Sequence, residues 1–146
     1  MSVHIFAQEP PELVMNALKN KFPSAINIKW VRQSRKHYEY PNNNLAFHKL
    51  SFIYYWKASF NLNNKKASST FTSDGHWICG ELEKSINELR EEVRNAIKHD
   101  YPDCEILSIY LSEWIGSGSG YEIKIKCGNT VKEVGYNENG WPPPKI

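Results

Sequence analysis

The apolar residues of this chain form two helical stripes, each closed by a proline. The first helix is predicted between Pro10 and Pro23, because apolar residues recur there at intervals of three and four, the spacing of one helix face. The second is predicted from Ser85 to Pro102 and opens with Ser85-Ile-Asn-Glu88, which has capping-box spacing. The stripes are Leu13, Val14, Ala17, Leu18 and Phe22 in the first helix, and Ile86, Leu89, Val93, Ala96, Ile97 and Tyr101 in the second.

Alternating apolar and polar residues follow each helix and predict β-strands. An apolar side opposite a polar side is typical of an antiparallel sheet that is covered on one face only. The dipeptides Asn63-Asn64 and Gly128-Asn129 predict hairpin turns, and Asp74-Gly75 and Asn139-Gly140 predict further turns. The expected covered side consists of Ile26, Ile28, Trp30, Phe52, Tyr54, Trp56, Ala58 and Phe60, then Leu107, Ile109, Leu111, Tyr121, Ile123, Ile125 and Cys127.

The two halves of the chain repeat each other. The segment PPELVMNALKNKFP at 10–23 matches LREEVRNAIKHDYP at 89–102 with an offset of 79. The strand pattern from Trp56 to Gly75 matches that from Tyr121 to Gly140 with an offset of 65, so the first copy carries 79 − 65 = 14 extra residues. Repeated apolar spacing and turn chemistry indicate one supersecondary unit used twice.

The predicted fold class is therefore α+β. Two tandem units, each a helix followed by three or four strands, are expected to form one long antiparallel sheet with both helices on one face and the other face open. We expect a single domain over residues 1–146, the length of one ordinary domain. Repeat one covers 10–80, with the insert at 31–50, and repeat two covers 85–141.

The net charge of +2 hides an asymmetry between the halves. Residues 1–73 hold 10 Lys/Arg against 3 Asp/Glu, and residues 74–146 hold 8 against 13, so the halves carry +7 and −5. Two interpretations stay open: the halves attract each other, or the first copy presents a basic face to an acidic partner. The chain has no apolar run of the roughly 18 residues that a membrane-spanning helix needs.

The cysteines and histidines favour no covalent or metal chemistry. Cys79, Cys104 and Cys127 cannot all pair and none has metal-site spacing, so buried free thiols are expected. The five histidines are scattered, with no pair at helical ligand spacing, so no metal site is predicted. The start, MSVHIFAQ, is no complete signal peptide although its end is similar to one, which leaves both an exported and a cytoplasmic protein possible.

Both copies together resemble the PepSY-like family, tandem repeats with a fold like that of the β-lactamase inhibitor protein. The resemblance implies a periplasmic or secreted protein that binds proteins or peptides, in some relatives inhibiting a hydrolase, and it implies no reaction. The 14 extra residues and the incomplete signal depart from the family pattern. The resemblance rests on Val14, Ala17, Phe22, Pro23, Ala25, Ile28, Trp30, Trp56, Ala58, Phe60, Phe71, Asp74, Gly75 and Trp77, then on Val93, Ala96, Tyr101, Pro102, Tyr121, Ile123, Ile125, Tyr136, Gly140 and Trp141.

No catalytic motif is present in the sequence, so neither an enzyme nor a cofactor is predicted. The glycine-rich stretch Gly116–Gly120 lacks the Lys-Ser/Thr of a phosphate loop and is interpreted as a hairpin loop. Glu91 and Glu92 are adjacent on a helix and diverge too far to share a substrate. Asp74 beside His76 is explained by a turn, and the second copy has no histidine there.

The residues expected to bind a partner lie on the open sheet face and in the insert. Tyr55, Tyr110 and Trp114, with Lys57, are expected on the polar side of their strands, where large amphipathic side chains serve as interface anchors. Tyr38 and Arg35 belong to the insert, in which cationic and aromatic residues alternate as in binding loops. In both places the alternative is structural: aromatics that shield neighbouring strands, and an elongated hairpin.

The predicted function is a non-enzymatic binding module with a protein or peptide partner. Its partner and its oligomeric state stay unidentified. One alternative is a basic surface for single-stranded nucleic acid or another polyanion, which the sequence favours less. Another is a small-molecule-binding protein with a pocket between sheet and helices.

Overall fold

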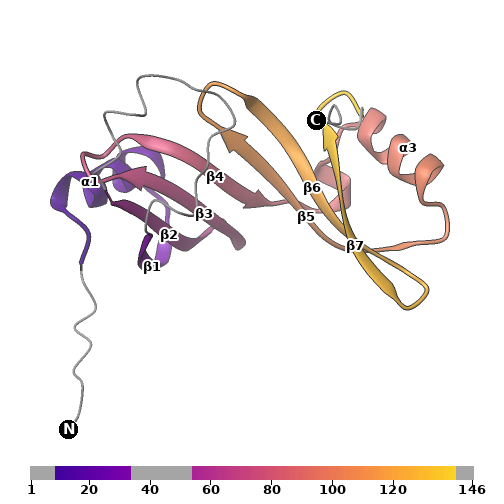
Figure 1. Cartoon of the computed structure of the whole chain (residues 1–146), viewed down its shortest axis with the longest axis horizontal. Helices are drawn as coiled ribbons and strands as arrows, with labels where there is room; N and C mark the ends of the chain where they lie inside the picture. Colours follow the sequence, from indigo (N-terminus) through magenta and orange to yellow (C-terminus); the bar gives the residue numbers. More distant parts are fainter. Residues whose placement is uncertain (1–8, 34–53, 141–146) are drawn as a thin grey trace, which may run out of the picture. The chain divides into compact units, whose positions relative to one another are not determined.

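The protein is an α+β structure built on one open antiparallel sheet, as predicted. The computed structural model describes residues 9–33 and 54–140. The seven described strands follow one another in the sheet in chain order, and the described residues include two α-helices (Figure 1). The elements are α1 (Glu12–Lys21), β1 (Ile26–Gln33), β2 (Tyr55–Leu62), β3 (Lys65–Thr72), β4 (Trp77–Glu83), the 3-10 turn η2 (Ile86–Glu88), α3 (Glu91–Asp100), β5 (Glu105–Trp114), β6 (Gly118–Cys127) and β7 (Thr130–Asn137).

The chain divides into two compact units that follow the repeat closely. Unit 1 comprises residues 1–64 and 68–78, and unit 2 comprises residues 65–67 and 79–146. That residues 1–146 fold as a single domain stays a prediction.

In unit 1, the helix α1 covers one side of the strands through its apolar stripe. Val14 and Leu18 are buried, and the ring of Phe22, just beyond the helix, lies 5.2 Å from the ring of Phe60 on β2. The ring of Trp30 on β1 lies 6.3 Å from the ring of Phe71 on β3. These contacts place the core of the unit between α1 and the inward side of its strands.

In unit 2, the helix α3 packs in the same way. One buried cluster joins the helix residues Val93 and Ile97 to residues on β5, β6 and β7. The hydroxyl of Tyr136 on β7 donates a hydrogen bond of 2.9 Å to Asp100 at the end of α3. The strand members of the cluster are Ile109, Tyr121, Ile123, Ile125 and Tyr136.

Equivalent positions of the two copies are buried alike, which confirms the core that the repeat predicts. The helix pairs Val14/Val93 and Leu18/Ile97 are at most 3% exposed. The strand pairs are at most 7% exposed, because the same alternation turns the same side of each strand inward. These strand pairs are Trp56/Tyr121, Ala58/Ile123, Phe60/Ile125 and Phe71/Tyr136.

The glycines of the predicted Asp-Gly and Asn-Gly turns pack against the helices. Gly75 has φ +88°, and a Cβ there would lie 2.9 Å from the carbonyl oxygen of Leu13. Gly140 has φ +79°, and a Cβ there would lie 2.6 Å from the carbonyl oxygen of Glu92. Leu13 and Glu92 are equivalent at the offset of 79, so both copies make this contact. The positive φ and the close approach together require glycine.

A bulge in the first strand of each copy makes part of the predicted alternation wrong. The register shifts between Ile26 and Lys29 in β1 and between Ile106 and Ser108 in β5. An extra residue reverses the sides of the residues before it. As a result, Ile26, Ile28 and Leu107 are 60%, 37% and 44% exposed instead of buried. The bulges lie at equivalent positions, since Ile28 and Leu107 also differ by 79.

The predicted beginning of the second helix is wrong, and one residue of the first helix stripe is exposed instead of buried. Ser85 makes no side-chain cap; the segment after it forms the separate turn η2, and α3 begins only at Glu91. Ile86 is consequently 38% exposed and lies outside the helix stripe. In α1, Leu13 is 63% exposed. The turns are correct: Asn63 and Asn64 both have positive φ, as a two-residue type I′ hairpin requires.

The prediction of three free thiols is also wrong. Cys104 and Cys127 form a disulfide with a Cα–Cα distance of 4.4 Å, and Cys79 is buried and takes no part in it. Glu105 pairs with Lys126 across β5 and β6. Cys104 precedes Glu105 and Cys127 follows Lys126, so the two cysteines lie opposite each other. Cross-strand neighbours of this kind meet the distance that a disulfide needs.

Candidate partner-binding face

The predicted site residues fall into three groups. Tyr55 and Lys57 lie on β2 in unit 1, and Tyr110 and Trp114 lie on β5 in unit 2. Tyr38 and Arg35 lie outside the described residues, so the contribution of the insert stays a prediction. The structure therefore places two of the predicted residues on β2 and two on β5.

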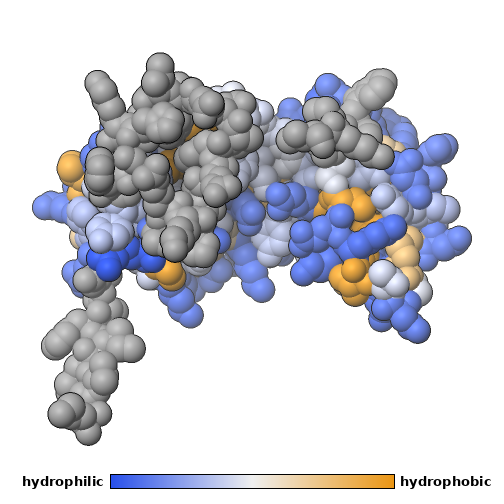
Figure 2. Space-filling view, viewed as in Figure 1, coloured by the Kyte–Doolittle hydropathy of each residue, from blue (hydrophilic) through white to orange (hydrophobic). Residues whose placement is uncertain are grey.

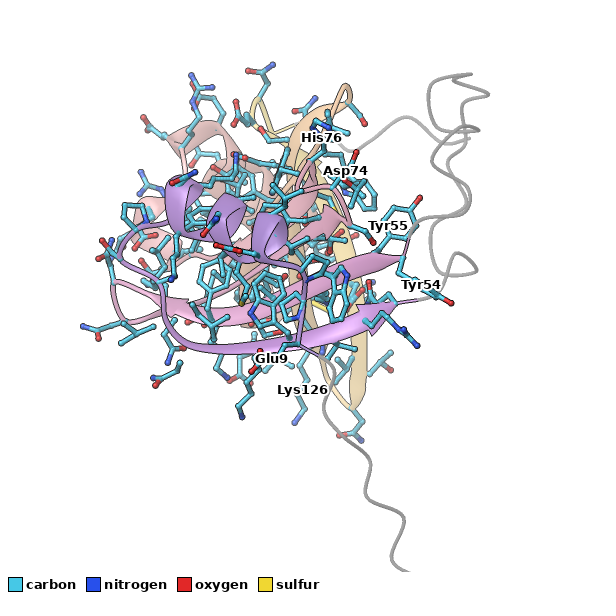
Figure 3. The ribbon with its side chains drawn as sticks, turned by 90° about the vertical axis from the view of Figure 1, so that its left-hand side faces the viewer. Glu9, Tyr54, Tyr55, Asp74, His76 and Lys126 are labelled. Carbon is cyan, nitrogen blue, oxygen red and sulfur yellow. A yellow bond between two sulfur atoms is a disulfide. The ribbon has the colours of Figure 1, made fainter. Side chains whose placement is uncertain are left out.

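The predicted aromatic anchor on β2, Tyr55, is buried and not exposed. Tyr55 is 4% exposed, as buried as the neighbouring core residue Trp56, whereas a residue on the open side was expected to be accessible. The preceding Tyr54 is 52% exposed instead, and its ring lies 4.3 Å from the guanidinium of Arg32. Tyr55 is the first residue of β2, and Tyr54 directly precedes the strand (Figure 3). Tyr55 therefore supports the structure of unit 1.

The two residues on β5 lie on its outward side, as predicted. Ile109 belongs to the core cluster of unit 2, so alternation turns Tyr110, Ser112 and Trp114 to the opposite face. Trp114 is 41% exposed and Tyr110 is half-buried. In the view of Figure 2, hydrophobic side chains gather in separate patches on a mostly hydrophilic surface. We call this outward side of β4–β7 in unit 2 the outer face.

The strand register brings Glu81, Glu122 and Glu133 onto the outer face, in addition to Glu83, which pairs with Tyr110. Glu81 on β4 pairs with Ser112 on β5, and Glu122 on β6 pairs with Tyr110. Glu133 on β7 pairs with Lys124, which follows Glu122 on the same side of β6. We call Glu81, Glu122 and Glu133 the acidic patch. Lys124 lies opposite Glu133 at one end of the patch.

The carboxyl group of Glu122 has a raised pKa. Loss of surrounding water raises the pKa of its carboxyl group, and the negative charges of Glu81 and Glu133 raise it further. The side chain is nevertheless exposed, so a partner can reach it. Ionised Glu122 is held in an unfavourable environment, which a cation placed beside it would improve.

Ser112 adds a second unusual feature beside Glu122. Its side chain is 7% exposed, and its Oγ is the one buried side-chain oxygen or nitrogen of the described residues without a hydrogen-bond partner. The hydroxyl lies close enough to Glu122 to lower the pKa of that carboxyl group, but this effect is smaller than those that raise the pKa. The two groups do not complete a hydrogen bond of normal geometry. A buried polar group left unpaired is costly in a folded protein.

Glycines leave the outer face open around Glu122. Gly120 lies opposite Ser112, and Gly135 lies opposite Glu122 itself. A Cβ at Gly120 would lie 3.3 Å from the carbonyl oxygen of Tyr136, so packing explains this glycine in part. Neither residue places a side chain over the face, and a strand without side chains allows another chain to approach closely.

Neither a metal centre nor a catalytic group emerges from the described part of the chain. Among residues 9–33 and 54–140, no three His, Cys, Asp or Glu side chains are placed to share a metal ion. Asp74 and His76 lie next to each other in the turn after β3, with 3.5 Å between their nearest side-chain O and N atoms (Figure 3). Asp74 also accepts a hydrogen bond from Thr72, whose Oγ1 accepts one from the His76 backbone N–H. These bonds organise a turn.

Sequence reasoning missed the acidic patch because the patch depends on strand register. The alternation already turned Glu122 away from the core. The distance along the chain between Glu81, Glu122 and Glu133 gives no sign that they meet, and the bulge in β5 shifts the pairing by one residue. The charge of −5 on the second half was the only signal that could have drawn attention to this face.

No protein-family model matches the sequence, and no curated protein is detectably similar to it. Solved structures share the fold. A BLIP-like protein from Bacteroides fragilis superposes with a TM-score of 0.68 at 20% sequence identity, over 92% of this chain and 84% of that one. A "putative periplasmic" protein from Bacteroides eggerthii gives 0.73 at 18% identity, over 94% and 88%. A DUF2874 family protein from Bacteroides ovatus gives 0.71 at 18% identity, over 94% and 87%.

The chain thus has a BLIP-like fold, which is the fold that the sequence resemblance implied. At these identities the likeness concerns the fold alone. No helix in the described part of the chain is long and apolar enough to cross a membrane.

Proposed function

We propose that this protein is a non-enzymatic binding module that holds a protein or peptide on the outer face of unit 2. The observation that carries the proposal is the partly exposed Trp114 on the same side of β5 as the half-buried Tyr110, beside the accessible acidic patch. Large aromatic side chains next to charged groups are typical of the residues that dominate binding energy at interfaces. The BLIP-like neighbour supports a binding role by its fold only.

We also propose that the protein works outside the cytoplasm and belongs to the PepSY-like family that its sequence resembles. The disulfide between Cys104 and Cys127 supports export, because such bonds persist mainly in oxidising compartments. One structural neighbour is described as a "putative periplasmic" protein, which agrees with this location.

Site-specific photo-crosslinking tests the proposed binding face. A photoreactive phenylalanine analogue replaces Trp114 in one variant and the exposed Lys98 of α3 in a control variant, and both are irradiated in envelope extract. We expect discrete polypeptide adducts from position 114 that are absent from position 98 and that unlabelled wild-type protein competes away. Identical adduct patterns, or none at position 114, would refute the proposal.

A further inference from the structure

The acidic patch specifies the chemistry of a partner more closely than the aromatic residues do. We infer that Glu122, with Glu81 and Glu133 beside it, receives an arginine or lysine side chain of the bound polypeptide. The inference rests on the proposed function, because it assigns the partner's chemistry at the same face.

The fold does not require the charge of Glu122. At the offset of 65 the equivalent residue of copy one is Lys57, and the preceding outward position is Tyr55 where copy two has Gly120. Inward residues of the same strands are apolar and buried in both copies, as with Ala58 and Ile123. The same unit therefore accepts either charge at this position, and a negative charge is a property of copy two alone.

The electrostatics of the patch favour a cation. The raised pKa of Glu122 means that its ionised form is less stable in the folded protein than in water. The charged and titratable groups facing it are Glu81 and Glu83 on β4, Tyr110 on β5, Lys124 on β6 and Glu133 on β7. Lys124 is the one cation among them, and it lies opposite Glu133. Across the strands, Glu81 lies opposite Ser112, and Glu122 lies opposite Tyr110 and Gly135, so neither glutamate has a cation opposite it on β5–β7.

Ser112 supplies an independent indication of a ligand group. Its buried Oγ lacks a partner among the described residues and faces Glu122. A guanidinium or ammonium group at Glu122 would find the carboxylate oxygens as acceptors, and the Ser112 hydroxyl beneath them can donate to the same carboxylate. Its aliphatic stem could lie over Gly120 and Gly135, where no side chain projects.

Peptide binding to the full chain tests the inference. The probe is an acetylated, amidated Gly-Tyr-Arg-Gly-Gly peptide, and its control carries citrulline, which keeps the shape of arginine without the charge. Backbone amide shifts in NMR locate binding. We expect the arginine peptide to shift the amides of Glu81, Ser112 and Glu122 and the citrulline peptide to bind at least about tenfold more weakly.

Two variants make the test specific. Glu122→Lys installs the residue that copy one carries at this position, and Glu91→Gln removes a carboxylate from the exposed start of α3. We expect Glu122→Lys to abolish the preference for arginine and Glu91→Gln to leave it unchanged. Equal binding of both peptides, or equal loss in both variants, would overturn the inference.

The outcomes also separate the inference from the proposed function. A polypeptide that crosslinks at position 114 equally well in wild-type and Glu122→Lys backgrounds would overturn the inference and leave the binding face intact. Selective binding of the arginine peptide at Glu122, with no polypeptide adduct at position 114, would overturn the proposed function alone.

Discussion

Removing the disulfide should cost this protein a large share of its stability. The bond joins residues 23 positions apart, Cys104 before β5 and Cys127 at the end of β6. Closing a loop of that length in the unfolded chain lowers its entropy by an amount worth about 3.4 kcal/mol at 25 °C. Native domains are stable by about 5–15 kcal/mol, so this loss would be easy to measure.

Copy one provides a natural replacement pair. At the offsets of 79 and 65, Cys104 and Cys127 correspond to Ala25 and Leu62. Ile26 pairs with Asn61, so Ala25 and Leu62 continue the same register and lie opposite each other. The double variant Cys104→Ala, Cys127→Leu therefore fills the site with a pair that the fold already accommodates.

Urea unfolding followed by circular dichroism, with and without a reducing agent, measures the effect. We expect the double variant to lose about 3 kcal/mol of unfolding free energy relative to the oxidised wild type. The reducing agent should destabilise the wild type by a similar amount and leave the double variant unchanged, since Cys79, its one remaining cysteine, takes no part in the disulfide. A wild type that is insensitive to the reducing agent, or a double variant of wild-type stability, would refute the reasoning.

Three further changes test the fold and the site. Gly140→Ala should cost about 1–3 kcal/mol in urea unfolding, because φ is +79° and the new Cβ meets the Glu92 carbonyl; a neutral effect would contradict the proposed glycine–helix contact. Tyr55→Ala should lower the melting temperature and Trp114→Ala should leave it nearly unchanged, since Tyr55 is 4% and Trp114 41% exposed; the reverse order would count against the assignment of the outer face. Glu122→Gln should raise the unfolding free energy at neutral pH, because the raised pKa makes the ionised carboxyl group a destabilising one; the gain should shrink as pH falls through that pKa, and a gain independent of pH would exclude this explanation.

Periodicity predicted the core well because each residue's side depends on its neighbours along the chain. Val14, Val93 and the alternating positions of β2 and β6 are buried where the pattern placed them. The prediction failed at Ile28 and Leu107, where a bulge adds one residue and reverses the pattern. The disulfide and the acidic patch were missed for a related reason, since both depend on which residues face each other across strands, and that register is invisible in the local pattern.

The comparison of the two copies separates what the fold needs from what a partner could need. Features that both copies share are structural: the buried pairs, the bulges, and the glycines packed on Leu13 and Glu92. The outward positions differ in size and even in sign of charge, with Lys57 in one copy and Glu122 in the other. The fold holds either residue at this position, and in copy two the residue is a carboxylate whose raised pKa opposes folding at neutral pH. A residue that costs stability at an accessible position is most simply explained by what it binds.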